Sequence, residues 1–188
     1  MNDLVYEETD YGPLACLPGV WQGGSGEDIA PEPDGDENNP YYETLTFEAA
    51  GDVTNAEEQV LAVVRYHQIV SRISTGKVFH DQVGFWLWEA TTGTIMQTLT
   101  IPRGVTLLAG GRAIVNNGRT TLRVKAKEGS ADWGIIQSPF MQKKARTLEF
   151  RHDLTVDGDT LSYDETTVLE IYGNPRYLHT DRNILQRQ

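Results

Sequence analysis

The sequence predicts an all-β domain: a ten-stranded antiparallel up-and-down β-barrel of the lipocalin or fatty-acid-binding-protein shape. Short β-rich runs follow one another from residue 41 onward, with turn residues between them. Connections this short imply that sequential strands pair as neighbours. A glycine-rich run at Gly19–Gly26 and a segment around His179 lie at opposite ends of the chain. We expect the two ends to pair, because closure removes the exposed edges of an open sheet.

The composition of the chain limits its domain number, its partners and its location. The 188 residues fit one domain over 1–188, with a core that needs no metal or disulfide. Sixteen basic against 27 acidic residues give a net charge of −11, which disfavours nucleic acid and anionic membranes as partners. No apolar run approaches the ~20 residues of a membrane span, and the first residues lack a secretory pattern. We therefore expect a cytoplasmic protein, as a monomer or homodimer.

The elements follow in order along the chain. Residues 1–18 end in a short apolar turn and are expected to form an N-terminal lid over one barrel end. Residues 31–40 hold three prolines and four carboxylates without an apolar side chain, which predicts an acidic surface loop. The ten predicted strands are Val20–Ile29, Tyr42–Ala49, Gln59–Ile73, His80–Ala90, Thr94–Ile101, Val105–Ile114, Thr120–Ala126, Gly134–Phe140, Arg146–Val156 and Thr160–Tyr172.

Alternation along two of these strands predicts what faces inward. His152 shares its face with Phe150 and Leu154, and Glu165 shares its face with Tyr163. Because an Asp-Gly hairpin joins the two strands, His152 and Glu165 should lie roughly opposite one another. The pair is either a structural contact or a general acid–base pair.

Motif spacing excludes several chemistries. The four histidines show no zinc-site spacing, and the glycine run has neither the nucleophile elbow of a hydrolase nor the lysine of a phosphate loop. Its glycines are more consistent with a strand kink and a close backbone approach. A single histidine on the wall of an apolar barrel is either an axial ligand of haem iron or a hydrogen-bonded core residue.

Three motifs match a known family. The opening at Gly19–Gly26, the His80–Trp86 run, and His179 followed by Leu185-Gln186-Arg187 resemble the nitrobindin-like haem-binding β-barrels in order and spacing. The resemblance covers Leu17 to Arg187. It departs from the family after Gly26, where an acidic stretch replaces a Tyr-Pro, and after His179, where polar residues follow.

The resemblance implies a ten-stranded barrel that holds haem b. By position, His179 corresponds to the family's proximal histidine and metal ligand. Nitric oxide binding and isomerisation of peroxynitrite to nitrate are the implied activities, so an enzymatic function is open. Asp181 lies two residues further along the strand and is expected to orient the imidazole. The other cofactor-binding candidates, taken from the motifs, are Trp21, Gly23, Gly26, His80 and Trp86.

A second hypothesis is a haem-free carrier of an apolar or aromatic small molecule. A barrel of this size can enclose a cavity. A carrier of fatty acids needs an internal arginine for the ligand's carboxylate, and Arg65 and Arg123 are the candidates. The predicted lining residues are Tyr66, Phe85, Trp86 and Trp88.

Overall fold

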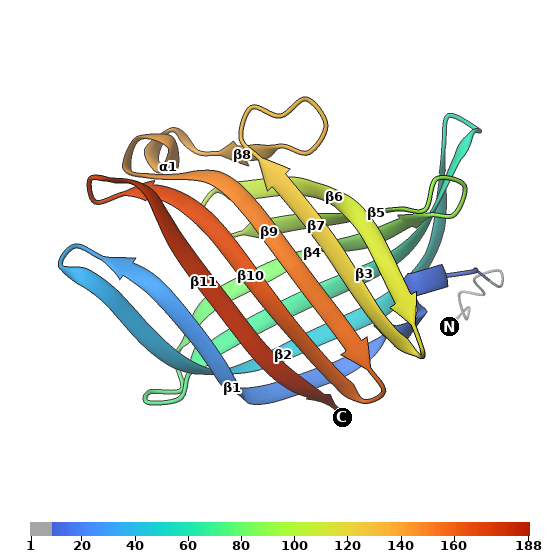
Figure 1. Ribbon diagram of the computed structural model, residues 1–188, viewed down its shortest axis with the longest axis horizontal. Coiled ribbons are helices and arrows are strands. Elements are labelled where there is room, and N and C mark those ends of the chain that lie inside the picture. Colours follow the sequence, from blue (N-terminus) through green and yellow to red (C-terminus); the bar gives the residue numbers. More distant parts are fainter. Residues whose placement is uncertain (1–8) are drawn as a thin grey trace, which may run out of the picture.

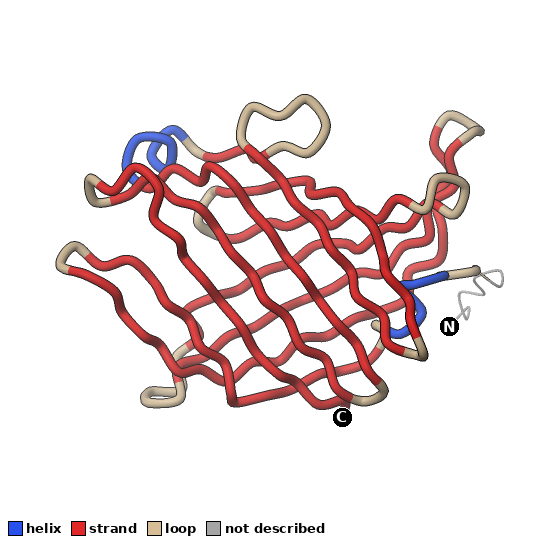
Figure 2. Tube along the Cα trace, viewed as in Figure 1, coloured by secondary structure: helices blue, strands red, loops and turns tan. Residues whose placement is uncertain are grey.

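The computed structural model describes residues 9–188, which form a closed antiparallel barrel (Figure 1 and Figure 2). Within this range, ten strands form the wall, and the β1–β11 and β5–β6 pairs complete the closure. The predicted fold class is confirmed. The elements are η1 (Gly12–Cys16), β1 (Gly19–Glu32), β2 (Gly35–Asn55), β3 (Gln59–Arg72), β4 (Val78–Glu89), β5 (Thr94–Ile101), β6 (Val105–Asn116), β7 (Arg119–Lys127), β8 (Ile135–Gln137), α1 (Pro139–Lys144), β9 (Ala145–Asp157), β10 (Thr160–Ile171) and β11 (Asn174–Arg187).

The predicted set of ten strands needs two corrections. The expected strand Gly134–Phe140 contains only the three-residue β8, which pairs with the edge of β6, followed by helix α1. Ser138 caps that helix by accepting a hydrogen bond from the Met141 amide, and Pro139 suits the first helical position. The missing wall strand is β11, whose inward positions are largely polar, so it lacks the apolar alternation that marks a strand.

The acidic segment 31–40 is a β-hairpin rather than a loop. Strands β1 and β2 stay paired up to Glu32 and Gly35. The β1–β11 ladder ends at Ile29 and Thr180, so the backbone of the hairpin tip is not paired with β11. Figure 1 shows the tip standing away from β11. Prolines are tolerated there because a free strand edge does not require their missing amide hydrogens.

The described part of the predicted lid, residues 9–18, closes one barrel end. Its 3-10 helix η1 inserts Leu14, and both Leu14 and Leu17 are fully buried in the apolar core. Arg187 secures the segment by donating to the carbonyls of Pro18 and Cys16 at 2.6 and 2.8 Å, and its guanidinium covers the Trp21 ring at 4.0 Å. Residues 1–8 of the predicted lid lie outside the described residues.

The barrel interior has three layers. Next to η1 is a dry apolar core, above it is a layer of buried polar side chains, and at the far end is a cavity. The apolar layer includes Trp21, Leu122, Leu154, Leu161 and Leu185.

Glycines in the opening run permit close packing. A Cβ on Gly26 would lie 2.2 Å from the ring of Tyr41, whereas one on Gly24 would lie 3.5 Å from Tyr42, an ordinary contact. We therefore expect Gly26→Ala to lower the free energy of unfolding by about 1–3 kcal/mol through overpacking. Gly24→Ala is the matched control and should change it by less than about 0.5 kcal/mol. Urea denaturation of both variants tests this, and equal stabilities would contradict it.

Candidate functional site

The cavity lies at the open end of the barrel, opposite η1, and has a volume of about 370 Å³. The β1–β2 hairpin, the β3–β4, β5–β6 and β10–β11 turns and helix α1 surround it. Its apolar wall includes Val70, Phe79, Leu99, Leu107, Phe150 and Leu169. Its ionisable wall residues are Asp28, Glu32, Glu37, Arg72, His80, Arg103, Glu165, His179 and Asp181. The cavity thus combines an apolar surface with a dense set of charges.

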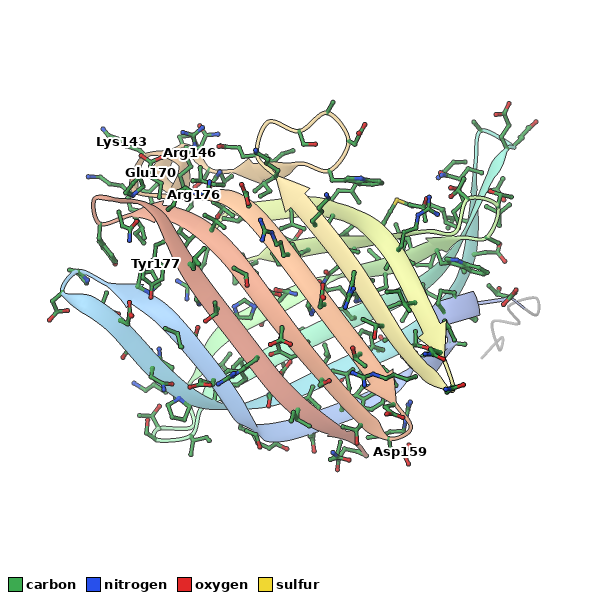
Figure 3. The ribbon with its side chains drawn as sticks, viewed as in Figure 1. Lys143, Arg146, Asp159, Glu170, Arg176 and Tyr177 are labelled. Atoms are coloured by element: carbon green, nitrogen blue, oxygen red, sulfur yellow. The ribbon has the colours of Figure 1, made fainter. Side chains whose placement is uncertain are left out.

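His179 lies on this wall where the two chain-end strands separate. The β1–β11 ladder ends at Thr180, so β11 from Asn174 to His179 has no pairing with β1. Across the gap, the Tyr177 hydroxyl donates to Asp36 at 2.8 Å. Figure 3 labels Tyr177 on β11, on the side of the β1–β2 hairpin. The His179 side chain is 34% exposed and is accessible from the cavity.

A carboxylate already contacts the His179 ring. Its Nε2 lies 2.6 Å from Oδ1 of Asp28, on the neighbouring strand β1. Asp28 itself is buried, and its Oδ2 accepts a hydrogen bond from Asn39 at 3.3 Å. Arg72 donates in turn to the Asn39 side-chain oxygen. These contacts hold the imidazole from the direction of the cavity mouth.

A second chain of contacts runs from the cavity into the barrel. Asp181, on the cavity wall, contacts the Tyr41 hydroxyl, which lies 2.7 Å from the Tyr163 hydroxyl. Tyr163 donates at 2.8 Å to Glu43, which is fully buried. Gln68 and Asn183 also donate to Glu43, both at 2.8 Å. Burial raises the pKa of Glu43, and burial and the neighbouring carboxylates raise the pKa of Asp181 to about 7.

This row of hydrogen-bonded side chains has more oxygen–oxygen contacts than its two tyrosine hydroxyl groups have hydrogens to donate. Three contacts join Asp181, Tyr41, Tyr163 and Glu43, but each tyrosine hydroxyl carries a single hydrogen. The third hydrogen must come from one of the carboxyl groups, because two oxygens at 2.7 Å without a hydrogen between them repel each other. One of the two carboxyl groups is therefore protonated, in agreement with their raised pKa values.

His152 forms a separate polar cluster between the core and the cavity. Its Nδ1 lies 3.0 Å from the Gln97 side-chain oxygen, and its Nε2 is buried with no hydrogen-bond partner among residues 9–188. Burial lowers its pKa to about 4. As predicted from the hairpin, Glu165 is its direct cross-strand neighbour, with Oε2 4.0 Å from Nδ1. Burial and nearby carboxylates raise the pKa of Glu165 far above its usual value, so burial disfavours the charged form of both groups.

The predicted site residues fall into two groups. His80, His179 and Asp181 are on the cavity wall, and His80 Nε2 contacts the Gln82 side-chain oxygen at 3.2 Å. Trp21, Gly23, Gly26 and Trp86 do not belong to that wall. Trp21 donates to the Leu17 carbonyl at 2.8 Å beside the lid, and Trp86 packs 5.8 Å from the His152 ring. Asp181, expected to orient His179, contacts Tyr41 instead.

The residues predicted for a carrier also lie elsewhere. Arg65 and Arg123 are on the outer surface, paired with Glu48 and Asp153. Phe85 is exposed, and Tyr66 is buried among the side-chain amides of the polar layer. The assignments of Arg65, Tyr66 and Phe85 fail because both faces of β3 and β4 carry large apolar side chains, so alternation does not reveal the inward one. The arginines on the cavity wall are Arg72 and Arg103.

Sequence reasoning missed Asp28, Glu43 and Asn39 as interior residues. Asp28 is two residues beyond Gly26 on the same inward face of β1, so the period of two was an available signal. Asn39 was hidden because residues 31–40 resemble a solvated loop. Glu43 alternates inward with Tyr41 and Leu45 on β2, but glutamate is rarely fully buried, so its residue type gives no sign of an interior position.

No helix in the described part of the chain is long and apolar enough to cross a membrane.

The comparisons with known proteins agree with this architecture. No curated protein matched the chain. Among solved structures, the crystal structure of Rv2717c from M. tuberculosis matches with a TM-score of 0.71 and 23% identity, over 95% of this chain and 99% of that one, which supports the fold. A family model described as "THAP4-like, heme-binding beta-barrel domain" matches residues 10–187. The chain therefore belongs to the THAP4-like haem-binding β-barrel domain family.

Proposed function

We propose that this barrel binds haem b in its open-end cavity, with His179 as the iron ligand, and through it binds nitric oxide or isomerises peroxynitrite. The observation that carries the proposal is that one nitrogen of the His179 ring contacts a carboxylate while the other has no hydrogen-bond partner among residues 9–188. A metal-binding histidine gives one ring nitrogen to the metal and commonly the other to a carboxylate or carbonyl. Here Nε2 contacts Asp28, and Nδ1 has no hydrogen-bond partner among residues 9–188.

The rest of the cavity also fits haem. Leu99, Leu107 and Phe150 offer an apolar surface for the macrocycle. Arg72 and Arg103 can pair with its two propionate groups, since guanidinium groups bind carboxylates well. Bound haem would supply an iron with an open coordination position for nitric oxide or peroxynitrite. The chain's own residues would hold the group, shield it from water and orient the imidazole.

Haem titration of His179→Ala tests the assignment. The purified apoprotein should give a shifted Soret band with haemin, and His179→Ala should lower the affinity on the order of 100-fold or more, since losing a supporting contact alone costs about 10–100-fold. His67 provides a matched control, because it is an exposed histidine that also contacts an aspartate, Asp81, at 2.9 Å. His67→Ala should bind as wild type does. An unchanged Soret band and affinity in His179→Ala would refute the ligand assignment.

The alternative is a carrier for an apolar carboxylate. The arginines at the cavity wall favour it as well, because a free carboxylate could pair with Arg72 or Arg103. This function predicts tight binding of a fluorescent fatty acid, loss of that binding in Arg72→Ala or Arg103→Ala, and no dependence on His179. Haem uptake that depends on His179 would decide in favour of the first proposal.

A further inference from the structure

The contact between His179 and Asp28 determines the tautomer of the ring. A neutral imidazole has one N–H donor and one lone pair, whereas a carboxylate only accepts hydrogen bonds. With Nε2 at 2.6 Å from Oδ1 of Asp28, the hydrogen must be on Nε2. The lone pair then remains on Nδ1, which has no hydrogen-bond partner among residues 9–188.

Asp28 is itself held in place. It is 6% exposed, and Asn39, which donates to its second oxygen, is 4% exposed. Arg72 donates to the Asn39 side-chain oxygen, and its guanidinium lies 5.0 Å from the centre of the Phe79 ring. The Asp28 carboxylate that contacts His179 is thus held in place by Asn39, and Asn39 is held by Arg72 on the cavity wall.

We propose that Asp28 is the positioning residue of His179, which fixes both the tautomer and the orientation of its imidazole so that the second nitrogen is left for a metal. The inference rests on the proposed function for the identity of that metal. Its direct claim is about the ring itself. Asp181 does not take this role, because the carboxylate that contacts the His179 ring is that of Asp28, whereas Asp181 contacts the Tyr41 hydroxyl.

A similar pair on the outer surface provides the internal comparison. His67 and Asp81 also make an Nε2–Oδ1 contact, at 2.9 Å, but their side chains are 47% and 52% exposed. In water such a contact competes with hydration and is weak. The side chain of Asp28 is 9% exposed, so its contact with His179 is better shielded.

Nitrogen-15 NMR of the apoprotein tests the claim without haem. At a pH where the ring is neutral, His179 of the wild type should show the Nε2–H tautomer in large excess. Asp28→Leu should shift His179 towards a mixture of tautomers, and Asp28→Asn, which keeps a carbonyl acceptor, should restore most of the excess. Asp81→Asn should leave the His179 signals unchanged. A wild-type His179 with mixed tautomers, or one that Asp28→Leu does not alter, would overturn the proposal.

Haem titration of the same variants adds a second readout. Asp28→Leu should weaken haemin binding about 10- to 100-fold and shift the Soret band, as loss of a ligand-orienting partner does. Asp28→Asn should recover part of the loss. If Asp28→Leu binds haemin as tightly as the wild type does, and His179→Ala still weakens haemin binding, Asp28 is not the positioning residue of His179, but the proposed function stands. If the wild type takes up no haem, the proposed function fails, and the NMR tautomer ratio alone decides whether Asp28 orients the ring.

Discussion

Replacing Glu43 by alanine is expected to lower the free energy of unfolding by about 3–5 kcal/mol. The carboxylate is fully buried and accepts hydrogen bonds from Gln68, Tyr163 and Asn183. Its removal leaves the side-chain amides of Gln68 and Asn183 without their acceptor, and leaves Tyr163 with only the Tyr41 hydroxyl as a partner. Each unsatisfied buried donor costs about 1–3 kcal/mol before relaxation or entering water reduces the total. The loss should appear as a lower urea midpoint with an unchanged slope.

Two variants make this result specific. Glu48→Ala is on the same strand, but Glu48 is 56% exposed and pairs with Arg65 on the surface. It should cost less than about 1 kcal/mol. Glu43→Gln keeps the volume and one acceptor oxygen, so its loss should fall between the two. If Glu43→Ala were as stable as Glu48→Ala, the hydrogen bonds to Glu43 would contribute no net stability.

The second large effect concerns pH. Burial raises the pKa of Asp181 to about 7, and raises those of Glu43 and Glu165, whereas unfolded carboxyl groups titrate near pH 4. The folded state therefore binds more protons than the unfolded state as pH rises from about 4 through 7. Stability from these groups is present in acid and is lost as pH rises through the folded pKa.

His152 has the opposite sign at lower pH. Its pKa of about 4 in the fold lies below the usual histidine value of 6.5, so its contribution is complete above pH 6.5 and is lost as pH falls towards 4. The two effects oppose each other between pH 4 and 6.5, whereas above pH 6.5 the effect of His152 no longer opposes that of the carboxyl groups. We therefore expect the unfolding free energy to fall between pH 6.5 and 8.

Variants separate the two contributions. Asp181→Asn should reduce the decline between pH 6.5 and 8, and His152→Phe should change the pH dependence only below pH 6.5. Urea denaturation at several pH values measures both. A wild-type stability that rises from pH 6.5 to 8 would contradict the raised carboxyl pKa values. The titratable groups around Asp181 are Asp28 on β1, Tyr41 and Glu43 on β2, Glu165 on β10 and His179 on β11.

The barrel itself follows from local sequence patterns. Turn residues at regular spacing and alternating apolar side chains are properties of short segments, so they predict antiparallel strands that pair in order. The same alternation places His152 and Glu165 inward, and the Asp-Gly turn between their strands sets their register. His179 and Asp181 share the inward face of β11 because side chains two residues apart point to the same side of a strand, although β11 lacks the apolar alternation that marks a strand.

What surrounds these inward side chains depends on strands that are distant in the sequence. The register of β1 against β11 places Asp28 opposite Asp181, and the adjoining His179 meets the Asp28 carboxylate across 151 positions of sequence. No local pattern records that register, because no turn joins β1 to β11, whereas the turn of a hairpin fixes the register of the strands it connects. Tertiary packing likewise decides where the β1–β11 ladder ends beside His179. It also decides that residues 31–40 form a hairpin and that Glu43 is hydrogen-bonded inside the barrel. The sequence thus predicts nine of the ten wall strands and the candidate histidine, whereas the partner of that histidine and the shape of the cavity arise only when the chain ends meet.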